Sequence, residues 1–229
     1  LPRFAMGLHV GTYSGGTWKN EEMTSDKYPP ALCKRLREEG VPFDLLWLDS
    51  TWRLFNTTYG NGGCCFEWRN TFKDPKAMFD SCYAQNVKMV GLHIRSILDN
   101  GPEYHLLDKA REQGNVLYAG AKTDLKGLHN IFPLAYAEAP YRKFQEYNNM
   151  RGLTHTREGY AGIQRYPYIW AGDWGSEWQW FEPVIRAGLN IGMSGVGNWT
   201  HCMGGFEQYS PYDTELYTRW VQFGMFSPI

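Results

Sequence analysis

The strongest constraint on the fold is an alternation of short apolar stretches with longer stretches of helical periodicity. The apolar stretches predict strands at 4–10, 43–50, 87–94, 116–124, 152–158, 168–173, 190–196 and 223–229. Between them, apolar residues recur at helical spacing in 28–40, 74–86, 103–114, 132–148, 178–189 and 213–224. Strands that alternate with helices are typical of a parallel sheet joined by crossover helices. The sequence therefore predicts an α/β fold.

The eight predicted strands indicate a (β/α)8 TIM barrel formed by residues 1–229 as one catalytic domain. A chain of 229 residues with 43% hydrophobic residues can bury the core of one large domain. The connection at 158–165 is too short for a full helix, and no helix follows the last predicted strand. We therefore expect a barrel that is trimmed at its C-terminal end.

Charge and hydropathy exclude several classes of partner. The 23 Lys and Arg residues nearly balance the 24 Asp and Glu residues, so no global field would attract nucleic acid. No apolar run approaches the roughly 20 residues that cross a bilayer, and the first residues lack a basic start and a cleavage site. The sequence leaves the compartment and the oligomeric state open, with a secreted or periplasmic location slightly favoured over a cytoplasmic one.

Cysteine and histidine usage gives no indication of a metal or a disulfide framework. The five cysteines are odd in number and lack CxxC spacing, which favours buried free thiols. His9, His93 and His201 could form a metal cluster with Asp49, but no HxH or HxxxH spacing supports one. We favour substrate hydrogen bonding for these histidines, then a core position, and a metal last. No cofactor is expected.

Aromatic residues are unusually frequent, at 10 Trp, 15 Tyr and 12 Phe. Sugar-binding sites commonly use such rings, because the C–H face of a pyranose stacks on an aromatic plane. An aromatic-rich core explains the composition equally well. If the rings bind sugar, Trp52, Trp68 and Trp199 are the best stacking candidates, since each is expected in a loop after a strand.

Polar residues end most of the predicted strands. In a TIM barrel the chemistry lies where strands run into the loops at their C-terminal ends, so we expect these side chains to share one mouth. For any single Asp among them, a helix or loop cap is the more common role. The residues at these positions are His9, Asp49, His93, Asp124, Arg157 and Asp173, with Asn198 and His201 after the seventh strand.

Two of these carboxylates suit cleavage of a glycosidic bond, which needs one ionised and one protonated acid. Lys122 lies close to Asp124 in "AGAKTD", and a nearby cation would keep Asp124 ionised as a nucleophile. Trp170 and Trp174 flank Asp173 in "WAGDW". Aromatic surroundings disfavour the charged form of a carboxyl group, so we expect Asp173 to keep a proton and act as general acid.

Several ordered motifs resemble glycoside hydrolase family 31, the retaining α-glycosidases. They are "FDLLWLDSTW", "FKDPKAMFD", "GIQRYPYIWAGDWGSEW", "LNIGMSGVGNW", "GGF" and "ELYTRWVQFGMFSPI", and they run along almost the whole chain. The resemblance implies a barrel enzyme that cleaves a terminal α-linked sugar. It covers α-glucosidases, α-xylosidases, α-galactosidases and α-N-acetylgalactosaminidases.

The resemblance also implies roles for individual residues. Asp124 matches the family nucleophile in a K-x-D segment, with Lys122 as a substrate contact. Trp170 and Asp173 match the W-x-G-D motif, whose Asp is the acid/base. Arg157 matches an arginine that binds the sugar ring, and Asp49 of "WLD" matches a carboxylate that binds the sugar's hydroxyls.

Two departures from the family pattern stand out. The region before "K-x-D" is shortened, and "HCMGGF" places Cys202 where the family has an Asp. A thiol is a weaker hydroxyl acceptor than a carboxylate, which points away from a plain glucosidase toward xylo-, galacto- or N-acetylgalactosamino-configured substrates. The predicted function is a retaining α-glycoside hydrolase acting on an oligosaccharide or glycoside. The alternative is a non-catalytic or truncated carbohydrate-binding barrel.

Overall fold

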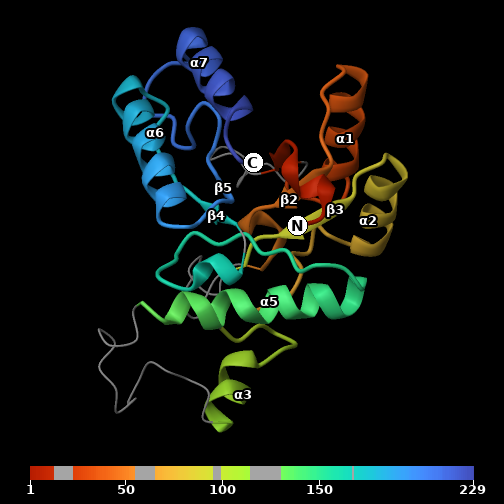
Figure 1. Ribbon diagram of the computed structural model, residues 1–229. Coiled ribbons are helices and arrows are strands. Elements are labelled where there is room, and N and C mark those ends of the chain that lie inside the picture. The colour runs from red at the N-terminus through yellow and green to blue at the C-terminus, as the bar shows by residue number, and fades with distance from the viewer. Residues whose placement is uncertain (13–22, 55–64, 95–98, 114–129, 167) are drawn as a thin grey trace. The chain divides into compact units, whose positions relative to one another are not determined.

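The computed structural model describes residues 1–12, 23–54, 65–94, 99–113, 130–166 and 168–229 (Figure 1). The chain divides into two compact units. One unit is Gly7–Lys122, and the other combines Leu1–Met6 with Thr123–Ile229.

The unit Gly7–Lys122 contains a three-stranded parallel sheet. Its strands are β1 (His9–Gly11), β2 (Leu45–Leu48) and β3 (Met89–Leu92), in the order β1-β2-β3. Val10 lies opposite Leu46, and Leu46 lies opposite Val90. The helices described in this unit are α1 (Tyr28–Glu38), α2 (Pro75–Ala84), α3 (Leu106–Glu112) and the short 3-10 helix η3 (Ser50–Trp52). The predicted parallel pairing is confirmed for these three strands.

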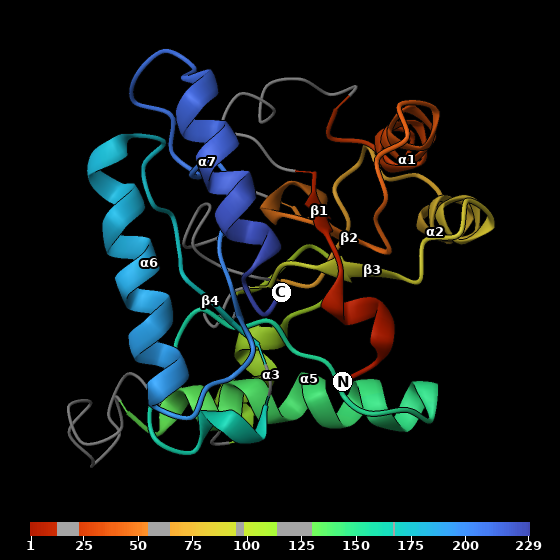
Figure 2. The same cartoon turned by 45° about the horizontal axis from the view of Figure 1, so that its top comes forward.

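The local sequence explains where the two longer helices of this unit begin. Prolines follow the first residue of α1, where a missing N–H costs nothing. The Asp74 carboxylate accepts a hydrogen bond from the Ala77 amide and caps α2. Figure 2 shows α1 and α2 side by side. They bury a core of Cys33, Phe43, Leu46, Leu48, Trp52, Phe72, Met78, Cys82, Val87 and Val90.

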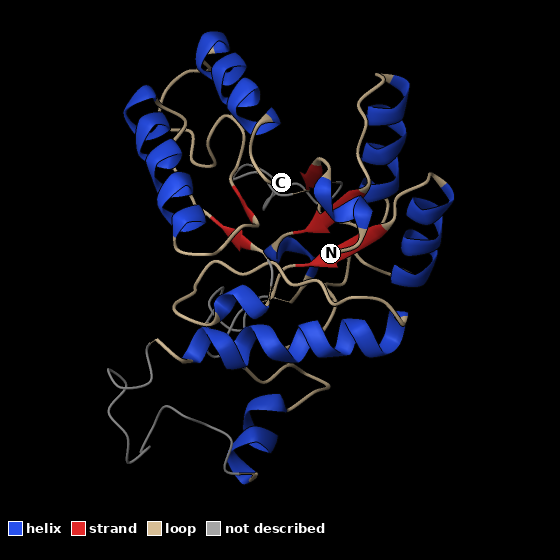
Figure 3. Ribbon diagram, viewed as in Figure 1, coloured by secondary structure: helices blue, strands red, loops and turns tan. Residues whose placement is uncertain are grey.

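The second unit has more helix than strand (Figure 3). Its elements are the 3-10 helix η1 (Arg3–Met6), α5 (Phe132–Asn148), the 3-10 helix η5 (Ile163–Arg165), β4 (Ile169–Trp170), α6 (Trp178–Met193), β5 (Trp199–Thr200) and α7 (Thr214–Met225). β4 and β5 pair in parallel, with Ile169 opposite Trp199. One core cluster, Val184, Trp199, Leu216 and Trp220, joins β5 to α6 and α7. The short 3-10 helix η5 occupies the connection that the sequence marked as too short for a full helix.

Two predicted strands are wrong because their residues continue a helix. α6 extends through Met193, since Ile191 continues the apolar face that buries Val184 and Gly188 at helical spacing. The strand in this region is β5, which follows a turn at Gly195 with φ +85°. In the same way, 223–225 belong to α7, where Phe223 follows Trp220 by three residues and packs on Phe181.

The other predicted strands have mixed outcomes. Residues 152–158 form only a single parallel bridge, between Thr156 and Ile169. Residues 3–6 form η1, and β1 begins later, at His9. The predicted strand 116–124 lies outside the described residues. In the described ranges the strands form two small parallel sheets and no closed barrel.

The cysteines and the hydropathy of the helices agree with the sequence reading where they are described. Cys33, Cys65, Cys82 and Cys202 are free thiols, and the first three are buried. Among the helices with described residues, none combines the length and apolar character needed to cross a bilayer.

Candidate functional site

Asp173 follows a strand end that is fixed by backbone pairing. Beyond Trp170, the last residue of β4, the Ala171 amide donates to the Thr200 carbonyl oxygen at 2.8 Å. Gly172 then adopts φ +94°, a left-handed conformation that favours glycine. A Cβ built on Gly172 would lie 3.1 Å from Nε of Arg157. The turn therefore sets Asp173 beside the Arg157 guanidinium.

Arg157 and Asp173 form an ion pair over an indole ring. Arg157 Nη1 lies 3.3 Å from Asp173 Oδ2, and the guanidinium carbon lies 5.3 Å from the centre of the Trp170 ring. The Trp170 amide donates to the Thr156 carbonyl oxygen at 2.8 Å, which holds the segment bearing Arg157 against β4. Both charged side chains keep part of their surface in solvent, 49% for Arg157 and 32% for Asp173. A carboxylate, a cation and an aromatic face at one strand end can bind a hydroxylated ligand.

The surroundings of Asp173 differ from the purely aromatic setting that the sequence predicts. The Trp174 indole Nε1 donates to the Ala171 carbonyl oxygen at 2.8 Å, and its ring packs on Trp180 with centroids 5.8 Å apart. The Arg157 guanidinium forms an ion pair with the Asp173 carboxylate, so a charged group as well as aromatic rings lies beside it. The sequence placed Arg157 at the site as a sugar ligand, and did not predict its pairing with Asp173.

Asp49 and His93 meet at the carboxyl edge of the three-stranded sheet. Asp49 follows β2 and His93 follows β3, and these strands are parallel neighbours. His93 Nδ1 lies 3.3 Å from Asp49 Oδ1. The Ser50 hydroxyl lies between them, 2.9 Å from Asp49 Oδ1 and 3.1 Å from His93 Nδ1. Sequence reasoning missed Ser50, whose only signal is its place directly after the strand-ending "WLD".

Two residues of this unit do not lie where the sequence predicts. His9 opens β1 opposite Leu45, so it lies at the amino-terminal end of the sheet and away from Asp49 and His93. Trp52 lies in η3 and is only 2% exposed. Its Nε1 donates to the His93 carbonyl oxygen at 2.7 Å, and its ring packs edge-on against Trp68. Trp52 thus supports the backbone at His93 from the core and presents no open face for a sugar.

His201 and Trp199 also lie in a core. The Trp220 indole donates to His201 Nδ1 at 3.0 Å, and His201 Nε2 lies 2.9 Å from the Ser227 hydroxyl. Burial lowers the pKa of His201 to about 4. Trp199 belongs to β5 rather than to a loop, and its ring lies against Gly188 of α6. Both were predicted to contact substrate, whereas the structure gives them packing and hydrogen-bonding partners within the protein.

Asp124 and Lys122 lie outside the described residues, and so does Cys64. Within the described ranges, no group of three or more His, Cys, Asp or Glu side chains is placed to hold a metal ion. The groups that the structure brings together are therefore Arg157, Asp173 and Trp170 in one unit, and Asp49, Ser50 and His93 in the other.

An acid at the end of a strand, paired with an arginine above a tryptophan ring, is an arrangement that suits carbohydrate binding. The model of the glycosyl hydrolases family 31 TIM-barrel domain matches residues 1–123 and 118–229. The chain belongs to glycosyl hydrolase family 31.

Relatives of the chain include two α-xylosidases. The chain is 26% identical to an α-xylosidase of Saccharolobus solfataricus over 100% of its own length and 37% of the relative. It is 26% identical to an α-xylosidase of Emericella nidulans over 92% of this chain and 28% of that one. An uncharacterised family 31 glucosidase of Pseudescherichia vulneris is 33% identical over 93% of this chain and 38% of its own. The chain thus spans well under half the length of these relatives.

Solved structures show the same fold. The α subunit of glucosidase II superimposes with a TM-score of 0.78 at 18% identity, over 98% of this chain and 30% of that one. A family 31 α-xylosidase from Xanthomonas citri gives 0.74 at 20% identity, over 100% of this chain and 32% of that one. The likeness and the family assignment support the TIM-barrel type of fold, although the described strands form no closed barrel.

Proposed function

We propose that this chain is the barrel region of a retaining α-glycoside hydrolase that removes a terminal α-linked sugar from an oligosaccharide or glycoside. The observation that best supports this proposal is the Arg157–Asp173 ion pair above Trp170, at the position of the family's W-x-G-D motif.

The proposed reaction is a double displacement. In the first step the Asp124 carboxylate attacks the anomeric carbon while Asp173 gives its proton to the departing oxygen, so the glycosidic bond breaks as the enzyme ester forms. In the second step Asp173 takes a proton from water, and the water oxygen displaces Asp124 from the anomeric carbon. The sugar leaves with its α configuration retained.

Arg157 is proposed to bind the sugar beside Asp173. Its Nη1 lies 3.3 Å from Asp173 Oδ2, so a guanidinium that donates hydrogen bonds to the sugar would hold the ring next to the acid.

Within the unit Gly7–Lys122, Asp49 and His93 are proposed to bind sugar hydroxyl groups. Ser50 donates to Asp49 Oδ1 from its hydroxyl, and it does so from its backbone amide as well. These bonds fix the carboxylate as an acceptor for sugar hydroxyls. The α-xylosidase relatives and the thiol of Cys202 in place of an acid favour a xylo-configured sugar, with galacto- and N-acetylgalactosamino-configured sugars as alternatives.

The test is hydrolysis of a panel of α-glycosides, with the anomer first released followed by NMR. Asp124→Ala should abolish turnover. Asp173→Ala should slow substrates with poor leaving groups by roughly 100-fold or more and activated aryl glycosides far less, because only poor leaving groups need the proton. Asp80→Ala, which removes an exposed carboxylate of α2, is the matched control and should match the unaltered protein.

The competing function is a carbohydrate-binding barrel without chemistry. It would show sugar binding without turnover in the same panel. Release of the β anomer, or equal losses in Asp173→Ala on good and poor leaving groups, would contradict the roles proposed here.

A further inference from the structure

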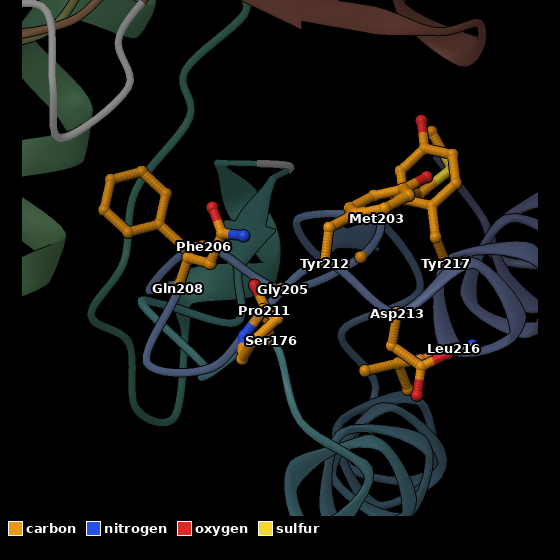
Figure 4. Close-up of a pocket in the computed structure, with 11 residues that line it drawn as sticks. Ser176, Met203, Gly205, Phe206, Gln208, Pro211, Tyr212, Asp213, Leu216 and Tyr217 are labelled. Carbon is orange, nitrogen blue, oxygen red and sulfur yellow. Dashed lines mark hydrogen bonds between the residues drawn. The ribbon is translucent and has the colours of Figure 1, made fainter.

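A pocket of about 190 Å³ lies in the second unit, and Figure 4 shows Phe206 and Tyr217 on either side of it. The Phe206 ring packs edge-on against Trp170, with centroids 5.9 Å apart, and Trp170 lies under the Arg157 guanidinium. Two packed aromatic rings therefore separate this pocket from the Arg157–Asp173 pair. We assign the pocket no part in the proposed reaction.

The polar cluster at the carboxyl edge of β2 and β3 determines which nitrogen of the His93 ring carries a hydrogen. A neutral imidazole has one N–H donor and one accepting nitrogen, and the hydrogen-bond partners of the ring decide which nitrogen is which. The partners of His93 Nδ1 are the Ser50 hydroxyl at 3.1 Å and Asp49 Oδ1 at 3.3 Å.

The Ser50 hydroxyl has a single hydrogen, and that hydrogen is directed to Asp49. The hydroxyl oxygen lies 2.9 Å from Asp49 Oδ1, and the Ser50 backbone amide donates to the same carboxylate oxygen. Because its hydrogen is used in this bond, the Ser50 oxygen can only accept a hydrogen from His93 Nδ1. Both groups beside Nδ1 are therefore acceptors, so the hydrogen of a neutral His93 ring belongs on Nδ1.

The backbone of His93 is held on both sides, which fixes the position of its ring. The His93 amide donates to the Leu48 carbonyl oxygen at 2.7 Å, and the Trp52 indole donates to the His93 carbonyl oxygen at 2.7 Å. Ser50 is only 2% exposed, whereas 33% of the His93 side chain is in solvent. The ring can therefore contact a ligand while its Nδ1 stays with buried groups.

We propose that Ser50 is a positioning residue that holds neutral His93 in the tautomer with hydrogen on Nδ1. Nε2 is then the accepting nitrogen of the ring, and it takes a hydrogen bond from a hydroxyl group of the ligand. The inference rests on the proposed function for the nature of that ligand, a sugar, whereas the tautomer is a property of the protein alone. Ser50 thus acts on the ligand through His93.

The experiment determines the tautomer from proton–nitrogen NMR correlation spectra of the ring nitrogens at about pH 8.5, where an ordinary imidazole is neutral. His201 is an internal reference, because its Nδ1 accepts from the Trp220 indole and its hydrogen must lie on Nε2. The His93 resonances, assigned by their loss in His93→Gln, should show the opposite pattern. A His93 pattern that matches His201 would overturn the proposal.

Removal of the hydroxyl tests the role of Ser50. Ser50→Ala should shift the ratio of the two His93 tautomers roughly 5-fold toward hydrogen on Nε2, because one of the two acceptors at Nδ1 is lost. Ser50→Thr retains a hydroxyl and should keep the tautomer of the unaltered protein. Ser81→Ala, which removes the hydroxyl of an exposed serine of α2, is the matched control and should change nothing. An unchanged ratio in Ser50→Ala would contradict the role of Ser50.

Sugar affinity gives a second measurement. Ser50→Ala should raise the KM of the best glycoside roughly 3- to 10-fold with kcat nearly unchanged, and Ser50→Thr should restore the KM. If no glycoside is turned over, the proposed hydrolase function fails, and the calorimetric Kd of the same glycosides replaces KM. Equal values in Ser50→Ala and Ser81→Ala, or no sugar binding, would contradict the ligand contact of His93, while the NMR spectra decide the tautomer separately.

Discussion

At the scale of single residues, the best-defined titrating group is His201. Its ring accepts a hydrogen bond from the Trp220 indole, faces the Ser227 hydroxyl and stacks on Phe223 with centroids 4.9 Å apart. The Ser227 hydroxyl donates onward to the Phe223 carbonyl oxygen at 3.1 Å. This chain of bonds is complete only with a neutral imidazole, since protonated Nδ1 could not accept the indole hydrogen.

The folded protein should therefore lose stability as His201 becomes protonated in the unfolded chain. Burial lowers the pKa of His201 in the folded state to about 4, against an ordinary value of 6.5. The unfolded state then binds an extra proton between these values, so the free energy of unfolding is highest above pH 6.5 and falls toward pH 4. The full loss from this residue is roughly 3 kcal/mol. Denaturant unfolding at several pH values measures it.

His201→Gln removes the titrating ring, so the pH dependence between 4 and 6.5 should become shallower by that amount. His105→Gln, at an exposed histidine, is the control and should keep the slope of the unaltered protein. Equal slopes in all three proteins would contradict the buried neutral state.

Sequence reasoning predicted that two of the candidate site residues lie close together, for a simple geometric reason, while their roles in substrate binding stay predictions. Asp49 and His93 follow parallel neighbouring strands, and the carboxyl ends of such strands share an edge. It failed for Trp52 and Trp199, because an aromatic residue near a strand end can face either the core or the solvent, and local sequence does not say which. It also missed Ser50, whose position between Asp49 and His93 depends on a contact between segments distant in the chain.

At the scale of elements, α6 packs against β5 at the position of Gly188. A Cβ built on Gly188 would lie 1.8 Å from the Trp199 ring, so the helix can approach the strand only where it has no side chain. Gly188→Ala should therefore destabilise the protein by about 1–3 kcal/mol through overpacking, although alanine is the better helix former. Thermal unfolding of the variant measures the loss.

Gly192→Ala in the same helix is the matched control. Nothing lies within 4 Å of a Cβ built there, so only the helix preference acts. This variant should be more stable by about 0.5–1 kcal/mol. If Gly188→Ala and Gly192→Ala changed stability in the same direction, the contact with Trp199 would not explain the effect of Gly188→Ala.

The helices were predicted from the sequence more accurately than the strands. The spacing of apolar residues predicted α5 at 132–148, the range that the structure shows. The strand patterns at 190–196 and 223–229 failed, because short apolar segments rich in glycine or phenylalanine also fit the last turn of a helix. There, packing of Ile191 and Phe223 against the core decides the conformation.

At the scale of the whole molecule, the residues that the structure describes form separate hydrophobic clusters. In each described cluster, all the residues come from one unit: Leu46 belongs to the core of Gly7–Lys122, and Leu216 to that of the other unit. Sequence alone predicted one barrel domain, and the family assignment supports that type of fold. The periodicity of apolar residues and the composition predict which residues are buried. They do not predict how the buried residues divide into clusters.

This division predicts that a substitution that weakens one core lowers stability only in the unit that contains that core. Leu46→Ala and Leu216→Ala remove the same atoms from nearly inaccessible sites, and each should cost about 2–5 kcal/mol. Native-state amide hydrogen exchange should show protection falling in β2, α1 and α2 for Leu46→Ala, and in α6, β5 and α7 for Leu216→Ala. If either substitution lowered protection equally in both sets of amides, the two cores would unfold as one, and the division into thermodynamic units would be wrong.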